Sequence, residues 1–316
     1  MRKSVLVLFA VVFMAHNLFS QTIGERTWEK KYGFEEGLTQ AFVIEATNTS
    51  EGNDSQYLLA LNSSAGTINT YKVDKKTGAI GKLLFKKVLD KKGTWGAAIM
   101  GRRSLAISYA DYGAFEILTI NKDGSIGEKT YETNSFEKGI SIVVPMLEST
   151  LLIKPNSGFA WLFDSANGKL GSITWQNQNW DKGMTAGICC HGGSSYVALT
   201  RPDGHFWIAN CKNKKNVEIM YSTDKFAKGI TTIASNPTKA NAIMLADPST
   251  GHQWGVKATA SDVKVITDSP NWEKGLTVQA FAVFQSKYGY NIPKEGFLYV
   301  FKPEIGAVWV FKTAIN

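Results

Sequence analysis

Cysteine is scarce in this chain, and its scarcity excludes a small domain held together by disulfides. The cysteines are odd in number and two of them are adjacent: Cys189, Cys190 and Cys211. A disulfide framework uses an even number of spaced cysteines. We therefore expect mostly buried thiols without redox chemistry.

Long apolar runs are absent after the first residues. No later segment approaches the roughly 18 continuous apolar residues that a membrane-spanning helix needs. At the start, Arg2 and Lys3 precede an apolar run over Val5–Met14, and the small residue Ser20 follows. This layout is typical of a cleavable secretory signal of bacterial type, and an uncleaved anchor is the alternative. We therefore expect a signal peptide at 1–20, no membrane insertion, and a secreted or periplasmic protein.

Charge of one sign is not concentrated anywhere. The formal net charge is +8, and the lysines are scattered at turns without a block of five or more. A scattered surplus is typical of a solvated surface rather than of a nucleic-acid track, so we expect no nucleic-acid partner. Such a surface can still favour an anionic polysaccharide or a negatively charged cell surface.

Arginine is rare beyond residue 20, which disfavours sialidase chemistry because that chemistry requires an arginine cluster. The arginines there are Arg26, Arg102, Arg103 and Arg201.

What the chain does contain is a repeat. A glycine closes a short loop directly before an apolar strand six times, at intervals of 56, 46, 44, 46 and 46 residues. A period in the forties built from strand-like pieces is typical of a β-propeller blade. The glycines are Gly37, Gly93, Gly139, Gly183, Gly229 and Gly275.

A second glycine in each unit closes a hairpin between two apolar strands. We therefore expect four strands per unit, named A (inner) to D (outer), with the first glycine in the D–A loop and the second in the B–C turn. Only ten residues follow the last B–C glycine, so the segment from Gln21 to Gly37 is predicted to supply the missing outer strand. The predicted fold is an all-β, six-bladed propeller over 21–316. The B–C glycines are Gly66, Gly113, Gly158, Gly204, Gly251 and Gly306.

Aromatic residues and lysines recur in the D–A loops. One interpretation is packing, since large flat rings can fill the gap between stacked blades. The other is a ring of pockets in which an aromatic stacks on a sugar and a lysine lies beside it. The loop aromatics are Phe34, Phe136, Trp180, Phe226 and Trp272, and the lysines are Lys138, Lys182, Lys228 and Lys274. Strand C carries a further set, Trp161, Trp207, Trp254 and Trp309.

The first two blades depart from this pattern. Asn69 and Glu116 replace the strand C tryptophan, and Asp90 replaces the loop aromatic. Blade 2 also has an additional tryptophan and an unusual B–C turn: Trp95, Tyr109, Asp111 and Tyr112. If one pocket differs in specificity, these residues are predicted to form it; drift within a degenerate repeat is the alternative.

The A–B connections of blades 1 and 6 are about ten residues longer than the others. These blades are neighbours once the ring closes, so the two insertions should lie side by side. Long loops on a rigid scaffold commonly carry binding function. A recognition patch is one interpretation, with Tyr288, Tyr290 and Asn291 facing Glu51, Asn53 and Asp54; decoration of the closure seam is the other.

In the layout of its repeats the chain resembles the secreted β-propeller lectins, such as the fungal fucose-binding lectins and the tachylectin and tectonin group. The resemblance covers 21–316 and rests on repeated aromatic and polar positions; the Arg–Glu–Trp set of a fucose site does not recur. It implies carbohydrate binding in pockets between blades.

The predicted inner strands line the channel of a propeller, so their residues can be compared with those that a propeller enzyme would need there. A calcium-dependent lactonase-like propeller needs several oxygen ligands there. Acidic or imidazole side chains occur only at the far ends of these strands, as Glu45 and His191. We therefore expect no metal and no cofactor. A glycosidase with a pair of catalytic carboxylates stays an open alternative, because the sequence does not show how far apart two carboxylates lie in the folded protein.

Binding is favoured over catalysis because polar residues recur at equivalent loops instead of clustering once. We predict a secreted, lectin-like protein whose partner is a glycan or cell-surface polysaccharide. The alternatives are a polysaccharide-active hydrolase or lyase with a site on one rim, and a protein-interaction propeller that uses the long loops of blades 1 and 6. The sequence gives no prediction of oligomeric state.

Overall fold

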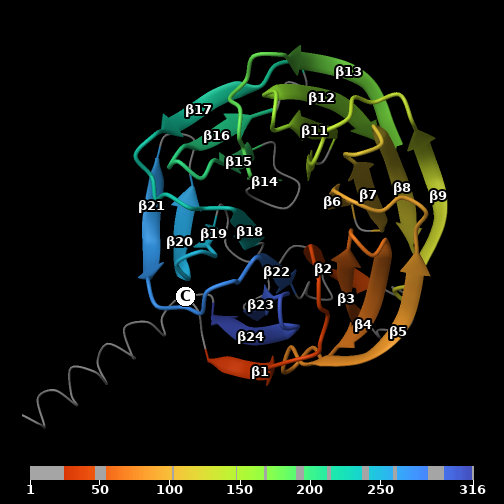
Figure 1. The fold of residues 1–316 in the computed structure, drawn as a ribbon, viewed down its shortest axis with the longest axis vertical. Helices are drawn as coiled ribbons and strands as arrows, with labels where there is room; N and C mark the ends of the chain where they lie inside the picture. The colour runs from red at the N-terminus through yellow and green to blue at the C-terminus, as the bar shows by residue number, and fades with distance from the viewer. Residues whose placement is uncertain are drawn as a thin grey trace, which may run out of the picture.

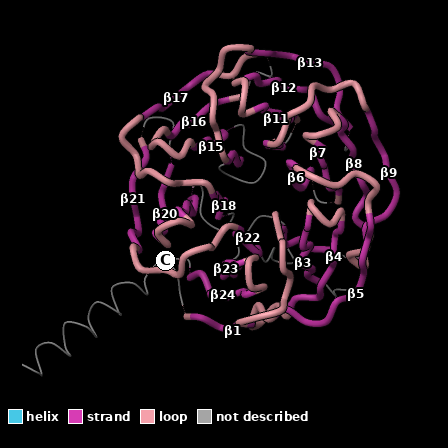
Figure 2. The backbone as a smooth tube through the Cα atoms, in the orientation of Figure 1, coloured by secondary structure: helices cyan, strands magenta, loops and turns pink. Residues whose placement is uncertain are grey.

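Six sheets of four antiparallel strands form a ring in the computed structural model (Figure 1). The structure describes residues 25–46, 55–101, 103–146, 148–166, 169–189, 196–211, 215–236, 242–258, 262–283 and 295–314. These residues form strands and loops (Figure 2), and within them no helix is long and apolar enough to cross a membrane. The predicted all-β, six-bladed propeller is confirmed.

The strands run from the inner A position to the outer D position in each blade. Blade 1 consists of β2 (Gln40–Ala46), β3 (Ser55–Asn62), β4 (Thr67–Val73) and β5 (Ile80–Val88). Blade 2 consists of β6 (Trp95–Met100), β7 (Ser104–Tyr109), β8 (Ala114–Ile120) and β9 (Ile126–Thr133). Blade 3 consists of β10 (Ile142–Pro145), β11 (Ser149–Lys154), β12 (Phe159–Ala166) and β13 (Lys169–Asn177).

The second half of the ring repeats this order until the last outer strand. Blade 4 consists of β14 (Ala186–Cys189), β15 (Tyr196–Thr200), β16 (Phe206–Asn210) and β17 (Glu218–Thr223). Blade 5 consists of β18 (Thr232–Asn236), β19 (Ala242–Asp247), β20 (His252–Ala258) and β21 (Val263–Ser269). Blade 6 consists of β22 (Val278–Val283), β23 (Glu295–Lys302), β24 (Ala307–Ala314) and β1 (Arg26–Lys30).

The N-terminal strand closes the ring, as the spacing of the glycines predicts. β1 pairs antiparallel with β24, with Trp28 opposite Val310. The backbone of Lys312 donates a hydrogen bond to the carbonyl of Glu25 at 2.9 Å. In Figure 1 the first and last colours of the chain therefore lie side by side in one blade. This pairing covers an edge of β24 that would otherwise expose unpaired backbone groups.

The middle strands of a blade are buried on both faces, because another blade stacks on each side. Residues Leu105–Tyr109 of β7 and Ser149–Ile153 of β11 are all buried. In the outer strand β5, only Ile80 is buried. Sheets that are covered on both faces read as continuous apolar runs rather than as alternating patterns, and this explains the apolar B and C segments of the repeat.

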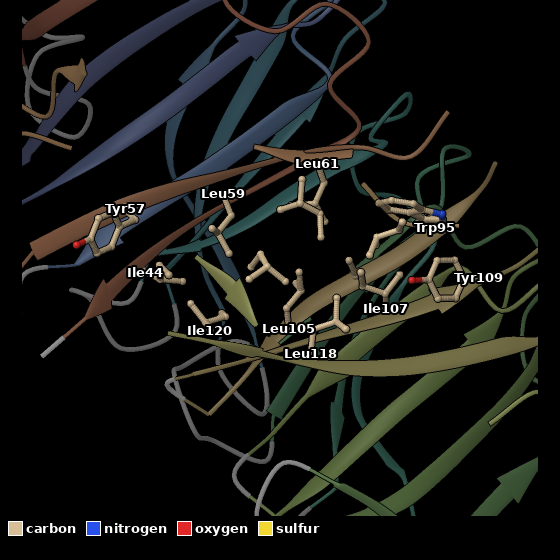
Figure 3. Close-up of a cluster of buried hydrophobic side chains, with 14 of the residues drawn as sticks. Ile44, Tyr57, Leu59, Leu61, Trp95, Leu105, Ile107, Tyr109, Leu118 and Ile120 are labelled. Atoms are coloured by element: carbon tan, nitrogen blue, oxygen red, sulfur yellow. The ribbon is translucent and has the colours of Figure 1, made fainter. Parts of the chain in front are cut away.

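Each gap between neighbouring blades holds its own hydrophobic cluster, and we name a gap by its two blades. The cluster of gap 1–2 joins Leu59 and Leu61 of blade 1 to Leu105 and Ile107 of blade 2 (Figure 3). The other described clusters fill gaps 2–3, 3–4, 4–5, 5–6 and 6–1 in the same way. Blade stacking is therefore the main source of apolar burial in this fold.

The two glycines of the repeat meet at one rim of the ring. The backbone N–H of Gly139, in the D–A loop, donates to the carbonyl of Ala110 in the preceding B–C turn at 2.7 Å. In the same loop, Phe136 donates to the carbonyl of Gly113 at 3.0 Å. Gly113 has a φ of 70°, and a Cβ there would collide with the carbonyl oxygen of Phe136. We call this face, made of D–A loops and B–C turns, the D–A rim.

Some predicted features lie outside the described residues. They are the signal peptide at 1–20, the recognition patch with Tyr288, Tyr290 and Asn291, its facing residues Glu51, Asn53 and Asp54, and Cys190. Among the cysteines, Cys211 is 1% exposed, so the prediction of a buried thiol is confirmed at that position.

Candidate functional site

The loop aromatics are half-buried and lie between neighbouring blades. The ring of Phe136 is 5.7 Å from that of Phe115 in blade 2 and 5.3 Å from that of Phe163 in blade 3. Rings at these distances pack favourably in tilted or edge-on geometry. The structure therefore gives this position a packing role, and its role toward a ligand stays a prediction. The corresponding pairs elsewhere are Phe34 with Tyr71, Trp180 with Trp175, Phe226 with Phe206, and Trp272 with Phe311.

The loop lysines lie exposed on the D–A rim: Lys138, Lys182, Lys228 and Lys274. In three loops the acidic residue just before the lysine forms an ion pair with a base at the next blade's B–C turn. The pairs are Glu137 with Lys154 at 3.0 Å, Asp181 with Arg201 at 3.5 Å, and Glu273 with Lys302 at 2.7 Å. Such exposed pairs contribute little stability, but they neutralise the acidic residue beside each exposed lysine.

Gap 6–1 breaks this pattern, because its loop carboxylate is bound by neutral groups. The Oε1 of Glu35 accepts a hydrogen bond from Nδ2 of Asn69 at 2.7 Å and another from the hydroxyl of Tyr71. Asn69 occupies the position of the strand C tryptophan. The ring of Phe34 lies 4.9 Å from that of Tyr71, and Tyr32 is 71% exposed in the same loop. A carboxylate, an amide and aromatic rings therefore meet at the rim.

Among the described residues, no basic side chain forms an ion pair with Glu35. Lys30 instead lies over the ring of Phe34, with its Nζ 6.0 Å from the ring centroid. Burial raises the pKa of Tyr71, and the hydrogen bond and charge of Glu35 raise it further, so the phenol remains a protonated donor. The Oδ1 of Asn69 is buried without a hydrogen-bond partner in the described part of the chain. The cluster therefore offers acceptors to a ligand that brings donors.

Gap 1–2 also departs from the pattern, with an ionic network around Glu116. The Oε1 of Glu116 lies 2.6 Å from Nζ of Lys91 and 3.0 Å from Nζ of Lys129. Its Oε2 accepts from the hydroxyl of Tyr109 at 2.9 Å. Lys129 also lies 2.9 Å from Oε2 of Glu132. Glu116 is 4% exposed, so its charge is stable only because these partners surround it.

Of the predicted residues of blade 2, Trp95 and Tyr109 come together at this network, while Asp111 and Tyr112 lie in the adjoining turn. Trp95 packs edge-on against Tyr109 at 5.6 Å, and its Nε1 donates to the carbonyl of Lys91 at 3.1 Å. In Figure 3, Trp95 and Tyr109 lie together at one end of the cluster. The Oδ2 of Asp111 accepts from the backbone of Thr94 at 2.7 Å. Tyr112 is 49% exposed.

Asp90 lies at the same rim without entering the gap. In this loop the backbone N–H of Leu89, and not that of Asp90, donates to the carbonyl of Gly66 at 2.8 Å. The contact with the B–C turn is therefore shifted by one residue, so that Leu89 is buried and Asp90 is exposed. Trp95 and Tyr109 supply the aromatic packing that a loop aromatic supplies elsewhere.

The electrostatics of gap 1–2 hold Lys91, Lys129 and Tyr109 in their ordinary ionisation states. Burial lowers the pKa of Lys91, but Glu116 and Glu132 outweigh it, so the pKa lies above its usual value. The pKa of Lys129 is raised, mainly by its hydrogen bond to Glu132. Burial, with the charge of Glu116, raises the pKa of Tyr109. None of these three groups is poised to exchange a proton near neutral pH.

Sequence reasoning identified Asn69, Glu116 and the aromatic residues, but it missed Glu35, Lys91 and Lys129. A signal for Glu35 was available: three loop acids have a basic partner at the following B–C turn, whereas blade 1 has Asn62 there. The described residues contain no group of three or more histidine, cysteine, aspartate or glutamate side chains that could hold a metal ion.

Comparisons with known proteins show the fold alone. No family model and no curated protein matches the sequence. A Lactobacillus plantarum protein of known structure is similar over 76% of this chain and 86% of its own, with 9% identity and a TM-score of 0.55. A chain of a mitotic checkpoint complex is similar over 92% of this chain and 95% of its own, with 9% identity and a TM-score of 0.53. Both likenesses agree with a propeller, and at this identity neither carries a function.

Proposed function

We propose that this protein is an exported, lectin-like binding protein that recognises carbohydrate on the D–A rim, at gap 6–1. The observation that carries the proposal is the carboxylate of Glu35, which is held by the neutral donors Asn69 and Tyr71 beside aromatic rings. The apolar run behind Arg2 and Lys3 supports export.

This composition suits a sugar for a chemical reason. Sugar hydroxyls are donors, and an ionised carboxylate is an acceptor with about four lone-pair sites, of which two on Glu35 are used here. The C–H face of a sugar ring is apolar and stacks on aromatic rings, for which Tyr32 is 71% exposed. A few polar groups that fix orientation beside apolar contacts are typical of small-molecule sites.

Binding fits the electrostatics better than acid–base catalysis does. The resolved pKa shifts of the described side chains stabilise their ordinary protonation states, as for Lys91, Tyr109 and Asp203. A general acid or base needs a pKa near the working pH. This favours recognition over the alternative of a polysaccharide-cleaving enzyme.

A glycan array with the protein lacking residues 1–20 tests the proposal, followed by affinity measurements on E35Q and E36Q. Glu36 is the matched control, because it is the exposed neighbour in the same loop. We expect E35Q to weaken binding of the selected glycan about tenfold or more, the loss of one charged hydrogen-bond acceptor, while E36Q leaves it unchanged. The proposal is wrong if no glycan binds, or if both variants behave alike. Turnover of a bound polysaccharide would instead support the hydrolase or lyase alternative.

A further inference from the structure

Gap 5–6 contains two buried glutamines at positions that are apolar in every other blade. Gln253 lies in β20, two residues after the B–C glycine, and is 1% exposed. Gln279 lies in β22, four residues after the D–A glycine, and is 7% exposed. The equivalents of Gln253 are Ile68, Phe115, Ala160, Phe206 and Val308. The equivalents of Gln279 are Ala41, Ala97, Val143, Gly187 and Ile233.

Strand register places Gln253 on the face of blade 5 that looks toward blade 6. Gln253 pairs with Ala246, which pairs with Thr232. The hydroxyl of Thr232 crosses the gap and donates to the carbonyl of Thr277 at 3.2 Å. Met244, two residues along β19 from Ala246, belongs to the cluster of gap 5–6. Successive strand residues alternate between faces, so Gln253 shares this face.

The same reasoning places Gln279 on the opposing face of blade 6. Gln279 pairs with Val300, and Val300 pairs with Trp309. Val300, Trp309 and Phe281 all belong to the cluster of gap 5–6. Both glutamines are near the strand ends that adjoin the D–A rim. They therefore face one gap from its two walls, both close to the rim, with Gln279 on the innermost strand of blade 6 and Gln253 on the third strand of blade 5.

Neither amide is paired in the part of the protein that the structure describes. Within the described part of the chain, Oε1 and Nε2 of Gln253 and of Gln279 are all buried and unpaired. Burying unpaired polar groups destabilises a protein. Gap 5–6 therefore has two buried, unpaired amides at positions where the other blades have apolar residues, and both amides lower folding stability. Proteins most often keep such unfavourable residues at functional sites.

We propose that gap 5–6 is a second binding site, which takes a neutral, hydroxyl-bearing group of a ligand from the D–A rim. Two amides supply both donors and acceptors without charge, which matches hydroxyls better than ions. The half-buried rings of Trp272 and Trp309 belong to the same gap and provide apolar contact for the C–H groups of such a ligand. The site rests on the proposed function only for the class of its ligand, a sugar, and uses none of the residues around Glu35.

Side-chain NMR on protein labelled with [15N]glutamine tests this site directly, with methyl glycosides of neutral hexoses as probes. The single variants Q253M and Q279M assign the two amide resonances, and methionine keeps a similar shape while removing the polar atoms. We expect both resonances to shift and saturate below about 50 mM glycoside, in the range of weak sugar binding. The double variant should lose this glycoside binding and should have a Tm higher by about 3 °C.

The matched control is T200V, which removes another buried and unpaired polar atom, in gap 4–5. It should leave the glycoside response intact. Unchanged Gln253 and Gln279 resonances at the highest glycoside concentration would overturn the inference, and so would a double variant that binds the glycoside as the unmodified protein does. If E35Q abolishes array binding while the glutamines show no response, the proposed function stands and this site fails. If the glutamine resonances respond to the glycoside but no glycan on the array binds, the proposed function fails and this site stands.

Discussion

Single residues decide whether a gap of this propeller is an apolar contact or a polar one. A strand C tryptophan fills the gap in four blades, whereas blade 2 has Glu116 and blade 1 has Asn69 at that position. A tryptophan is largely apolar and has a single N–H donor, but a buried carboxylate needs partners for both oxygens. Lys91, Lys129 and Tyr109 supply them. One replacement therefore required changes on a loop and on two strands.

Replacing Glu116 by alanine should destabilise the protein strongly. The change leaves Lys91, at 21% side-chain exposure, without its close carboxylate. Breaking a buried ion pair by removing one partner typically costs about 3–5 kcal/mol. Urea denaturation at neutral pH measures the loss. The control is E132Q, whose side chain is 38% exposed and which should cost much less than E116A. Similar losses for the two variants would contradict the network's dependence on Glu116.

Elements of this fold are held in place by turns that make side-chain hydrogen bonds to their own backbone. In the B–C turn of blade 5, Oδ1 of Asp247 accepts from the backbone and hydroxyl of Ser249, at 2.9 and 2.6 Å. Its Oδ2 accepts from the hydroxyl of Thr250 at 2.6 Å. The next D–A loop attaches here, since Gly275 donates to the carbonyl of Pro248 at 2.7 Å. The turn therefore holds the D–A loop that borders gap 5–6 in place at the D–A rim.

The contribution of Asp247 should depend on pH. Burial raises the pKa of its carboxyl, but the hydrogen bonds of Ser249 and Thr250 outweigh burial and hold the pKa below its usual value. A depressed folded-state pKa stabilises the protein above the unfolded value, about 3.9, and this stabilisation is lost as the pH falls through the folded value. We expect D247N to cost about 1–2 kcal/mol at pH 7 and clearly less near pH 3. Denaturation at both pH values measures this, and an equal cost at each would contradict it.

The strands were predictable from the sequence, and the site was predictable only in part. Glycines with positive φ recur because the turns require them, so Gly113 and Gly139 mark strand ends directly. Departures from the repeat identified Asn69 and Glu116. Their partners could not be identified, because contacts across a gap join residues from different blades. Gln253 and Gln279 were missed for the same reason, since their shared gap becomes visible only when strand faces are assigned.

The ring as a whole depends on one short strand. β1 has five residues, and it alone covers the outer edge of β24 in the described structure. The hydroxyl of Thr27 donates to the carbonyl of Val310 at 3.4 Å, across 283 residues of sequence. Without β1, blade 6 would present an unpaired edge and Phe34 would lose its attachment to Gly306.

Deleting residues 1–31 should therefore destabilise the whole ring and promote self-association. Size-exclusion chromatography with light scattering and a thermal melt measure the two effects. A synthetic peptide covering residues 25–36 should restore the elution profile of the longer chain and raise the Tm when added in excess, by mass action. A scrambled peptide is the control. A truncated protein that melts like the longer chain would show that β1 is dispensable for closure.

The pairing of β1 with β24 also sets an order in time. Of the described strands, β1 leaves the ribosome first during synthesis and β24 leaves last. Forming a contact across so long a loop costs chain entropy that only the complete set of blades can offset. Closure of the ring therefore has to wait for β24, and the nascent propeller stays open until that strand has been made. For the export proposed above, such late closure suits a translocation channel that admits unfolded polypeptide.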